Sequence, residues 1–450
     1  MSDIQQKHTS RLYFCAHVFL GILGLIGSGC ETDKTINSSP TTDQGQCPSE
    51  RRPLVLVHGF LASGDTWSRH TQRLINSGSC PKWIRTYDWN SLDMAGDQSE
   101  GLDQLIDDLL KLSELDQVDL IGHSAGGGVS YRYLSDTARA AKIHKYVHVG
   151  SFPEEAPPSP AGEEPIQMLN LWSSSDRTVE GADIEGATNV TLSEEDHYAV
   201  ATSEQSYREI VRFLYAEEVT SDDTRPAPRE TGELDIGGRV LTLGENQPLS
   251  NTVVQIWSVD ENGRRSGEVL AVTTDEAGIF QAPALPAGKS LEFAPIQLEN
   301  TSPPVRYFLP PLVRNDPLIY LRTFPSGASI ASILVNQLPR DEERVSLVVF
   351  SAHRALLAGV DSLLINGQEA LTTDIASAED TTIALFIFDV GADGEGGGSL
   401  PLFDRFPFLA GLDLPLRANP EEKISVVLNG DRVVIPASSA AEGTLIVTFP

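Results

Sequence analysis

The sequence predicts an α/β protein with a mostly parallel sheet covered by helices on both faces, followed by an all-β C-terminal region. Two observations support this fold class. Residues 51–217 alternate short apolar, β-branched runs with stretches of helical spacing, and residues 232–450 carry many short runs separated by turn residues. At 450 residues, the chain is also longer than a single core usually organises, so several domains are expected.

Strands and helices are expected to alternate through residues 51–217, the predicted catalytic domain. Strands are expected at 54–57, 84–89, 118–121, 146–149, 166–171 and 190–192, and helices at 67–75, 102–112, 125–134 and 204–214. Short, continuously apolar strands joined by helices indicate a parallel sheet that is buried on both faces.

A charged segment, residues 218–231, contains Pro226 and Pro228 and is predicted to be a linker. Residues 232–300 show short alternating strands with turns such as Gly237-Gly238 and Asn262-Gly263, which is typical of a small β-sandwich. Within them, residues 238–240, 248–250 and 274–280 resemble the prealbumin-like or carboxypeptidase-regulatory-like sandwich modules. Residues 301–450 are expected to form a further β-rich domain, with strands at 345–350, 382–388, 424–428 and 444–449.

The first 30 residues have the organisation of a targeting segment. Lys7 and Arg11 supply positive charge, and the apolar run 12–26 is too short to span a bilayer comfortably. Gly27, Ser28 and Gly29 then precede Cys30, which resembles the lipobox of bacterial lipoproteins. The resemblance implies a signal peptide over residues 1–29, a lipidated Cys30 and a polar tether over residues 30–50.

This organisation predicts an extracytoplasmic protein. A lipidated Cys30 would attach the chain to the outer membrane or the cell surface. Ordinary signal cleavage, which would give a secreted protein, is the alternative.

Charge and cysteine content narrow the classes of partner. A net charge of −30 excludes nucleic acid as a partner and disfavours anionic membrane surfaces. Cys47 and Cys80 are candidates for a disulfide in an oxidising compartment, with two free thiols as the alternative. No metal site is expected, because cysteine spacing does not suit zinc and the acidic turn around Asp389, Asp393 and Glu395 favours a solvated turn over a Ca²⁺ site.

The candidate nucleophile is Ser124, at the centre of Gly122-His123-Ser124-Ala125-Gly126. This string directly follows an apolar strand and directly precedes a helix, as a nucleophile elbow requires. Gly122 and Gly126 would remove the side chains that collide with the neighbouring strand and helix. The alternative is an ordinary glycine-rich start of a helix.

A serine hydroxyl needs a general base, and the base needs an acid that orients it. In this kind of fold the order along the chain is serine, acid, histidine. His197 alone follows both Ser124 and the last predicted strand, and Asp176 follows the strand between them after a short polar loop. Asp183 is a rival acid that lies further from the strand end, and Asp196 is expected to be solvated.

Two backbone amides are expected to form the oxyanion hole. One belongs to Ala125, directly after the nucleophile, and the other to Phe60 in the loop after the first strand. Each donor of this kind typically contributes about 3 kcal/mol to the stability of the transition state.

Together, Leu-Val-Leu-Val-His58-Gly59-Phe60, the elbow around Ser124, Ser-Ser-Asp176 and His197 resemble the minimal, lid-poor bacterial lipases of the α/β-hydrolase superfamily. The resemblance covers about residues 51–216. It implies hydrolysis of triacylglycerols or other carboxylic esters through an acyl-enzyme on Ser124, without a cofactor. Only the short insertion 152–165 stands where larger lipases carry a lid, so strong interfacial activation is not expected.

The two-part layout resembles an archaeal long-chain carboxylester hydrolase with a C-terminal β-domain. By that resemblance, the β-domains would help to shape the acyl site. The aromatic segment 402–409 is expected to pack in a core, and capping of the active-site mouth is the alternative. A thioesterase, a polyester depolymerase, an amidase or a catalytically silent surface-binding lipoprotein are the alternative functions.

Overall fold

The computed structural model describes residues 47, 51–155, 158–160, 162, 164–221, 223–225, 229–296, 303–325, 330–403 and 406–450. The predicted signal segment, Cys30 and most of the tether lie outside the described residues and stay predictions. Within the part of the chain that is described, no helix is both long enough and apolar enough to cross a membrane.

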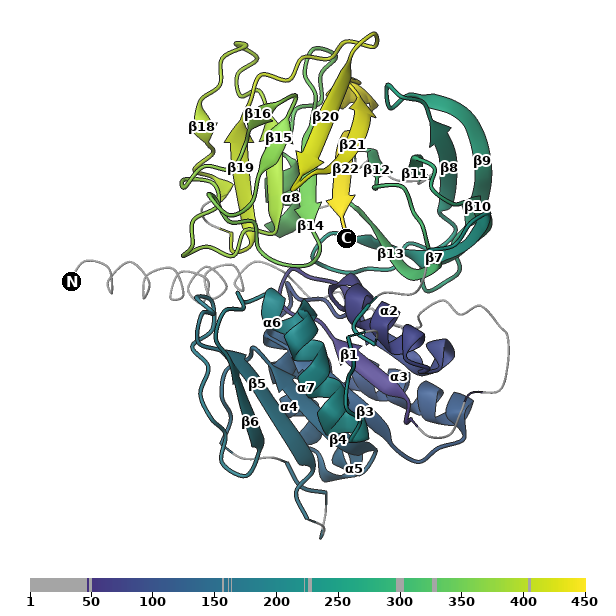
Figure 1. Cartoon of the computed structure of the whole chain (residues 1–450), viewed down its shortest axis with the longest axis vertical. Coiled ribbons are helices and arrows are strands. Elements are labelled where there is room, and N and C mark those ends of the chain that lie inside the picture. Colours follow the sequence, from purple (N-terminus) through teal and green to yellow (C-terminus); the bar gives the residue numbers. More distant parts are fainter. Residues whose placement is uncertain are drawn as a thin grey trace, which may run out of the picture.

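Six parallel strands form one sheet in the order β2-β1-β3-β4-β5-β6 (Figure 1). Their bounds are β1 (Leu54–Val57), β2 (Ile84–Tyr87), β3 (Val118–His123), β4 (Ile143–Val149), β5 (Gln167–Ser173) and β6 (Thr188–Leu192). Every strand predicted for this region is therefore present, within a few residues of its expected bounds. We call residues 51–217 the α/β region.

Helices cover both faces of this sheet. They are η1 (Gly64–Trp67), α2 (Ser68–Asn76), η2 (Pro81–Trp83), α3 (Ser99–Ser113), α4 (Ala125–Leu134), α5 (Thr137–Ala140), α6 (Ala199–Thr202) and α7 (Glu204–Tyr215). Val55 and Val57 of β1 belong to the core shared with α3 and α4, whereas Leu54 and Leu56 belong to the core shared with α2 and α7. Because successive strand residues point to opposite faces, one apolar run supplies both cores. The predicted fold class is confirmed.

In residues 232–450, which we call the β-region, nearly all of the regular elements among the described residues are strands. They are β7 (Glu233–Thr242), β8 (Val253–Val259), β9 (Arg265–Thr273), β10 (Ile279–Pro286), β11 (Leu291–Ile296), β12 (Val305–Phe308), β13 (Asp316–Thr323), β14 (Leu347–Ser351), β15 (Leu363–Ile365), β16 (Gln368–Glu369), β17 (Ala384–Phe388), β18 (Gly398–Ser399), β19 (Leu409–Asp413), β20 (Lys423–Leu428), β21 (Asp431–Pro436) and β22 (Thr444–Phe449), with α8 (Ile330–Val335) and η4 (Ala440–Glu442) between them.

One nine-stranded sheet, β18-β19-β17-β14-β22-β12-β11-β8-β9, is shared by two sandwiches. The three-stranded sheet β10-β7-β13 packs on one part of it, and their common core includes Val254, Phe280 and Phe293. The four-stranded sheet β16-β15-β20-β21 packs on another part, where Leu385 and Val426 share a core. Figure 1 shows these sheets together above the α/β region.

The predicted boundary between residues 300 and 301 needs correction, because it does not separate two sheets. β11 and β12 are neighbours in the nine-stranded sheet, and β13 pairs with β7. A sandwich that ended at residue 300 would leave one edge of β7 and one edge of β11 unpaired. The two strands that follow the boundary cover those edges, so the first sandwich extends to Thr323.

The β-region docks on the α/β region through the outer face of the β10-β7-β13 sheet. Asp88, which follows β2, accepts hydrogen bonds from Arg239 Nη1 at 2.5 Å and from Tyr320 Oη at 2.8 Å. The Asp88 and Arg239 side chains are essentially inaccessible to solvent. This buried ion pair fixes the β-region at the carboxyl ends of β1 and β2.

Cys47 and Cys80 are joined by a disulfide, with their Cα atoms 5.3 Å apart. The bond ties the chain just before the α/β region to the start of η2, as the sequence predicted.

Candidate active site

Ser124 lies on the sharp turn between β3 and α4. Its φ of 54° and ψ of −127° form a backbone conformation that residues with a side chain rarely adopt. A Cβ on Gly122 would lie 2.6 Å from Ser130 Oγ, and one on Gly126 would lie 2.3 Å from the carbonyl oxygen of His58. Both positions therefore require glycine, and the turn holds the Ser124 hydroxyl clear of the backbone.

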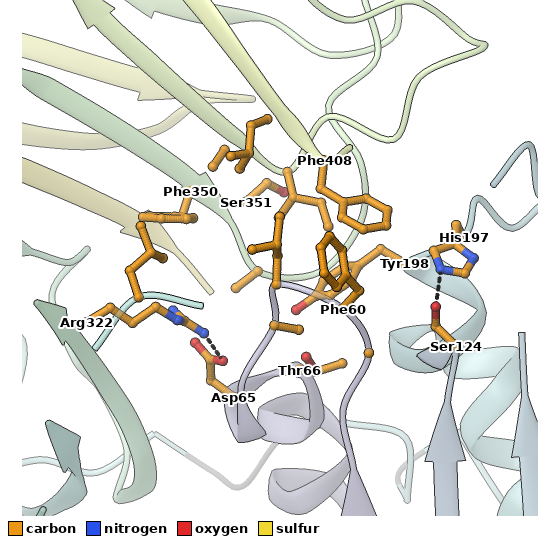
Figure 2. Close-up of a pocket in the computed structure, with 18 of the residues that line it drawn as sticks. Phe60, Asp65, Thr66, Ser124, His197, Tyr198, Arg322, Phe350, Ser351 and Phe408 are labelled. Carbon is orange, nitrogen blue, oxygen red and sulfur yellow. Dashed lines mark hydrogen bonds and ion pairs between the residues drawn. The ribbon is translucent and has the colours of Figure 1, made fainter. Parts of the chain in front are cut away.

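Ser124, His197 and Asp176 come together in one hydrogen-bonded line. His197 Nε2 lies 2.9 Å from Ser124 Oγ (Figure 2). On the other side of the ring, His197 Nδ1 lies 2.7 Å from Asp176 Oδ2. Because the carboxylate only accepts, Nδ1 carries the proton and Nε2 presents its lone pair to the serine hydroxyl. This arrangement can take a proton from Ser124 as its oxygen attacks a carbonyl carbon.

The surroundings of Asp176 keep it ionised. Burial alone would raise the pKa of the carboxyl, but hydrogen bonding to His197 and to two backbone amides outweighs it, so the pKa lies below the usual value. Those amides belong to Thr178 and Val179, which donate to Asp176 Oδ1 at 2.7 and 2.9 Å. An ionised Asp176 can hold the His197 ring and stabilise its protonated form.

The two rival carboxylates have other contacts. Asp183 Oδ1 accepts a hydrogen bond from Trp172 Nε1 at 3.2 Å, on the exposed side of β5. Asp196 Oδ1 accepts hydrogen bonds from the backbone amides of Tyr198 and Ala199, just before and at the start of α6. Asp196 is thus ordered by the backbone rather than solvated, in contrast to the sequence-based expectation.

Phe60 and Ala125 lie beside Ser124 with amides that can bind an oxyanion. Ala125 is the first residue of α4, so its N–H has no partner within the helix. A Cβ on Gly59 would lie 3.0 Å from Ser124 Cβ, which places the Gly59–Phe60 backbone against the nucleophile. Among the described residues, the Phe60 amide has no hydrogen-bond acceptor.

His123 packs directly against His197, with ring centroids 5.0 Å apart. Its Nε2 lies 2.9 Å from the carbonyl oxygen of His197 and donates to it. Burial, followed by the nearby His197, lowers the pKa of His123 to about 3. His123 is therefore neutral at ordinary pH and fixes the backbone of His197 without competing with it for a proton.

Ser124 opens on a pocket that lies between the two regions, with about 930 Å³ of space not occupied by protein atoms, part of it open to solvent. Figure 2 shows the pocket running from Ser124 and His197 past Phe60, Tyr198 and Phe408 toward the Arg322–Asp65 ion pair. Most of the lining is apolar. From the β-region it comprises Leu243, Arg322, Ala331, Leu334, Phe350, Ser351, Ala352, Ile383, Ala384, Phe386, Phe408, Leu409 and Thr448.

The aromatic segment 402–409 divides between a core and the site. Phe403 is fully buried and stacks on Phe386, with centroids 4.8 Å apart. Phe408 instead stacks on His197 at 5.8 Å, with the rings nearly parallel, and lines the pocket. Both expectations for this segment therefore hold, each for different residues.

Sequence reasoning did not identify the individual wall residues of the β-region. Leu243, Phe350 and Ala384 come from three places that are far apart in the chain, and each belongs to an ordinary apolar run. Phe408 alone had a local signal, the cluster of aromatic residues around it.

Other predicted features lie away from this site. Asp389 Oδ2 and Asp393 Oδ1 accept backbone hydrogen bonds from Gly394 and Glu395 within their own turn. The described residues contain no cluster of acidic, histidine or cysteine side chains that could hold a metal ion. In the insertion 152–165, Phe152 is exposed, and the described residues form no helix.

Known proteins resemble parts of this chain. A family model described only as a C-terminal domain matches residues 335–449. A Synechocystis protein whose name assigns it to the non-heme chloroperoxidases is 32% identical over 88 residues, or 18% of this chain. That match spans only 31% of the length of the Synechocystis protein.

Solved structures resemble the α/β region. The mature form of a Bacillus licheniformis lipase has 12% sequence identity and a TM-score of 0.31, covering 40% of this chain and 97% of its own. A bromoperoxidase from Bacillus anthracis has 20% identity and a TM-score of 0.28, covering 37% of this chain and 92% of its own. The order of the parallel strands and the turn at Ser124 show that residues 51–217 have the α/β-hydrolase fold.

Proposed function

We propose that this protein is a serine carboxylester hydrolase that forms an acyl-enzyme on Ser124. The observation that carries the proposal is the line of hydrogen bonds from Asp176 through His197 to Ser124, whose hydroxyl opens on an apolar pocket. A binding protein would have no need of a strained serine with an oriented base beside it.

In the proposed reaction, His197 Nε2 accepts the hydroxyl proton while Ser124 Oγ bonds to the ester carbonyl carbon. The carbonyl oxygen becomes an oxyanion held by the amides of Phe60 and Ala125. His197 then returns the proton to the leaving alkoxide as its bond to carbon breaks, which leaves the acyl group on Ser124. A water molecule, deprotonated by His197, then attacks the acyl carbon. The bond from that carbon to Ser124 Oγ breaks, His197 returns the proton to Ser124 Oγ, and the carboxylic acid is released.

The lining of the pocket favours an apolar acyl group, such as the fatty acyl chain of a lipid. The burial of each methylene group in an apolar pocket contributes about 0.8 kcal/mol, so such a wall discriminates by chain length. The similar proteins include ester hydrolases and haloperoxidases by name. The apolar pocket beside Ser124 supports ester hydrolysis.

Labelling with a fluorophosphonate probe tests the nucleophile. We expect the folded wild-type protein to be labelled, Ser124→Ala to remain unlabelled, and Ser174→Ala, which removes an exposed serine after β5, to label like wild type. A folded wild-type protein that resists the probe would sink the proposal.

A series of p-nitrophenyl esters from acetate to palmitate, with matched thioesters and anilides, tests the substrate class. We expect oxygen esters of medium or long chains to have the highest kcat/KM. A preference for thioesters or anilides would favour the thioesterase or amidase alternatives, and depolymerisation of an insoluble polyester would favour the depolymerase. Labelling without turnover of any of these esters would contradict the proposal.

We also propose that Cys30 carries a lipid anchor outside the cytoplasm, as its sequence context predicts. Incorporation of radiolabelled palmitate into the wild-type protein, and its loss in Cys30→Ala, is the expected result. Unlabelled, freely soluble wild-type protein would instead favour secretion.

A further inference from the structure

The turn between β7 and β8, residues 243–247, inserts into the α/β region behind the loop that carries Phe60. We call residues 58–63 the oxyanion loop. Asn246, in this turn, is only 1% exposed, although asparagine usually lies at protein surfaces. A buried amide is costly unless it is hydrogen-bonded, so its partners indicate its role.

The Asn246 side chain bonds to both ends of the oxyanion loop. Its Nδ2 lies 2.9 Å from the carbonyl oxygen of Ala62, 2.9 Å from that of Trp89 and 3.1 Å from His58 Nε2. Its Oδ1 accepts a hydrogen bond from Ser63 Oγ at 2.7 Å. Because the two carbonyl oxygens can only accept, the amide nitrogen must face them, which settles the orientation of the amide.

These contacts determine which nitrogen of His58 carries the proton. His58 Nε2 accepts from the backbone amide of Trp89 at 3.2 Å and faces Asn246 Nδ2, whose two N–H groups are shared among three acceptors and which cannot itself accept a proton. The proton is therefore on Nδ1, which donates to the carbonyl oxygen of Gly59 at 2.8 Å. Burial lowers the pKa of His58, which keeps the ring neutral.

The Gly59 carbonyl and the Phe60 amide belong to one planar trans peptide unit, so they point in opposite directions. A hydrogen bond that holds the Gly59 oxygen on the side of His58 consequently holds the Phe60 N–H on the opposite side. That N–H is the one oxyanion donor supplied by this loop. The direction of the donor is thus set by His58.

We propose that Asn246 of the β-region is a positioning residue for the oxyanion hole, which it aims by holding His58 in the tautomer that binds the Gly59 carbonyl. The inference rests on the proposed function, and it adds a role for the β-region that is separate from the pocket wall. A second link supports it: Ser91 Oγ accepts from the Leu61 amide at 3.0 Å and donates to the carbonyl oxygen of Gly244 at 3.1 Å.

The consequence is that the β-region affects catalysis even for an ester that is too short to touch its wall. Asn246→Gly is the sharpest test, since Asn246 has a φ of 54° that glycine adopts without strain. Loss of an entire oxyanion donor costs roughly 100- to 1,000-fold in kcat. A donor that is present but no longer aimed should cost less, so we expect kcat for p-nitrophenyl acetate to fall about 10- to 100-fold, with KM within about twofold of wild type.

Two further measurements separate positioning from a general loss of structure. A trifluoromethyl ketone, whose free carbonyl carbon is attacked by the serine so that its oxygen becomes an oxyanion in the hole, should bind Asn246→Gly more weakly by about the same factor as kcat/KM falls. Gln72→Ala is the matched control, because Gln72 Nε2 donates across the same interface to the carbonyl oxygen of Asn315 at 2.9 Å. We expect the control to keep the kcat of wild type.

If Asn246→Gly does not fold by circular dichroism, Ser63→Ala tests the same amide from its other end, with a smaller expected fall in kcat. Acetate turnover at the wild-type rate in the folded variant overturns the inference, as does an equal fall in Gln72→Ala. A wild-type protein that neither reacts with a fluorophosphonate nor hydrolyses any ester would instead overturn the proposed function, so the two failures are distinguishable.

Discussion

The two regions of the molecule contribute to the site in different ways. The α/β region supplies Ser124, Asp176 and His197 from three loops at one edge of a single parallel sheet. The β-region supplies much of the pocket wall, from positions spread between Leu243 and Thr448. The groups that would react therefore come from one region, and the proposed selectivity for the acyl group would come largely from the other.

The β-region also contacts three loops of the α/β region that take part in the proposed chemistry: the oxyanion loop and the loops of Asp176 and His197. Asn246 bonds to the oxyanion loop, and Thr381 Oγ1 lies 2.9 Å from Thr178 Oγ1 in the loop of Asp176. The backbone amide of Ala355 donates to Asp196 Oδ2, beside His197, at 3.1 Å. The two regions thus differ in how directly they would act: the α/β region holds the groups that would react, and the β-region contacts loops that carry them.

The largest effect should come from breaking the line of hydrogen bonds within the α/β region. Asp176→Asn would lower kcat about 10⁴-fold, because an amide cannot hold the His197 tautomer that accepts the serine proton. Steady-state kinetics with a p-nitrophenyl ester measure this. Asp183→Asn, which changes the rival carboxylate, is the control and should keep kcat within about twofold. Equal losses in both variants would contradict the assignment of Asp176.

The next effect concerns how firmly the two regions are joined. In Asp88→Ala the buried guanidinium of Arg239 loses its carboxylate partner and keeps its hydrogen bonds to the carbonyl oxygen of Ala277, which should lower the free energy of unfolding by about 3–5 kcal/mol. Urea denaturation followed by circular dichroism measures the loss. The double variant Asp88→Ala/Arg239→Met should recover part of it, because no unpaired charge stays buried.

Lys142→Ala is the control for Asp88→Ala, since Lys142 pairs with Asp103 and Asp107 on the surface and should contribute less than about 1 kcal/mol. If Asp88→Ala unfolds at the same urea concentration as this control, the buried pair does not join the regions. The remaining observed difference between the α/β region and the β-region would then be what each contributes to the pocket.

The sequence predicted the α/β region far better than the β-region, for a physical reason. Short apolar strands and helical spacing are local signals, and the carboxyl ends of parallel strands meet at one edge, so motifs at Ser124, Asp176 and His197 could be placed together without coordinates. The pairing of β7 with β13 joins segments about 80 residues apart, and no local pattern records it. The sandwich boundary was misplaced for this reason.

The role of Asn246 shows the same limit at the level of one residue. An asparagine in a turn is ordinarily explained by its tolerance of positive φ, which it indeed adopts here. Its contacts with the oxyanion loop depend on how two regions dock, and the sequence carries no mark of that docking.

A bulky substitution in the pocket wall should have a smaller effect and tests whether the β-region determines the chain-length preference. Ala331, on α8, is 2% exposed and lines the pocket, so Ala331→Phe would fill the space that the acyl chain of the proposed substrate would occupy. We expect the ratio of kcat/KM for p-nitrophenyl decanoate over acetate to fall roughly 10- to 100-fold, the range that changes of a few buried methylenes produce.

Ile333→Phe is a matched control on the same helix, since Ile333 is 49% exposed and does not line the pocket. The chain-length ratio should not change in this variant. A shift of equal size in both variants would mean that α8 acts through stability, and the wall assigned to the β-region would be in error.

The smallest effect per residue is a difference in acid stability between the regions. Burial lowers the pKa of His58, His70, His123 and His148 in the α/β region, to about 3 for His123 and about 4 for His148, and of His353 alone in the β-region, to about 4. At pH 7.5 these side chains are neutral in both the folded and unfolded states. Below the unfolded value of about 6.5, the unfolded chain binds protons that the fold excludes.

Stability should therefore fall as the pH drops through 6.5, by about 1.4 kcal/mol per pH unit for each fully buried histidine, until the folded pKa is reached. Between pH 7.5 and 5.5, the protection of backbone amides from hydrogen exchange should fall more in the α/β region than in the β-region. His70→Phe removes one such group between the rings of Trp67 and Tyr207 and should flatten the dependence. An equal loss of protection in both regions would mean that the two regions unfold together. The buried Asp88–Arg239 pair would then couple them so strongly that histidine protonation does not destabilise one region alone.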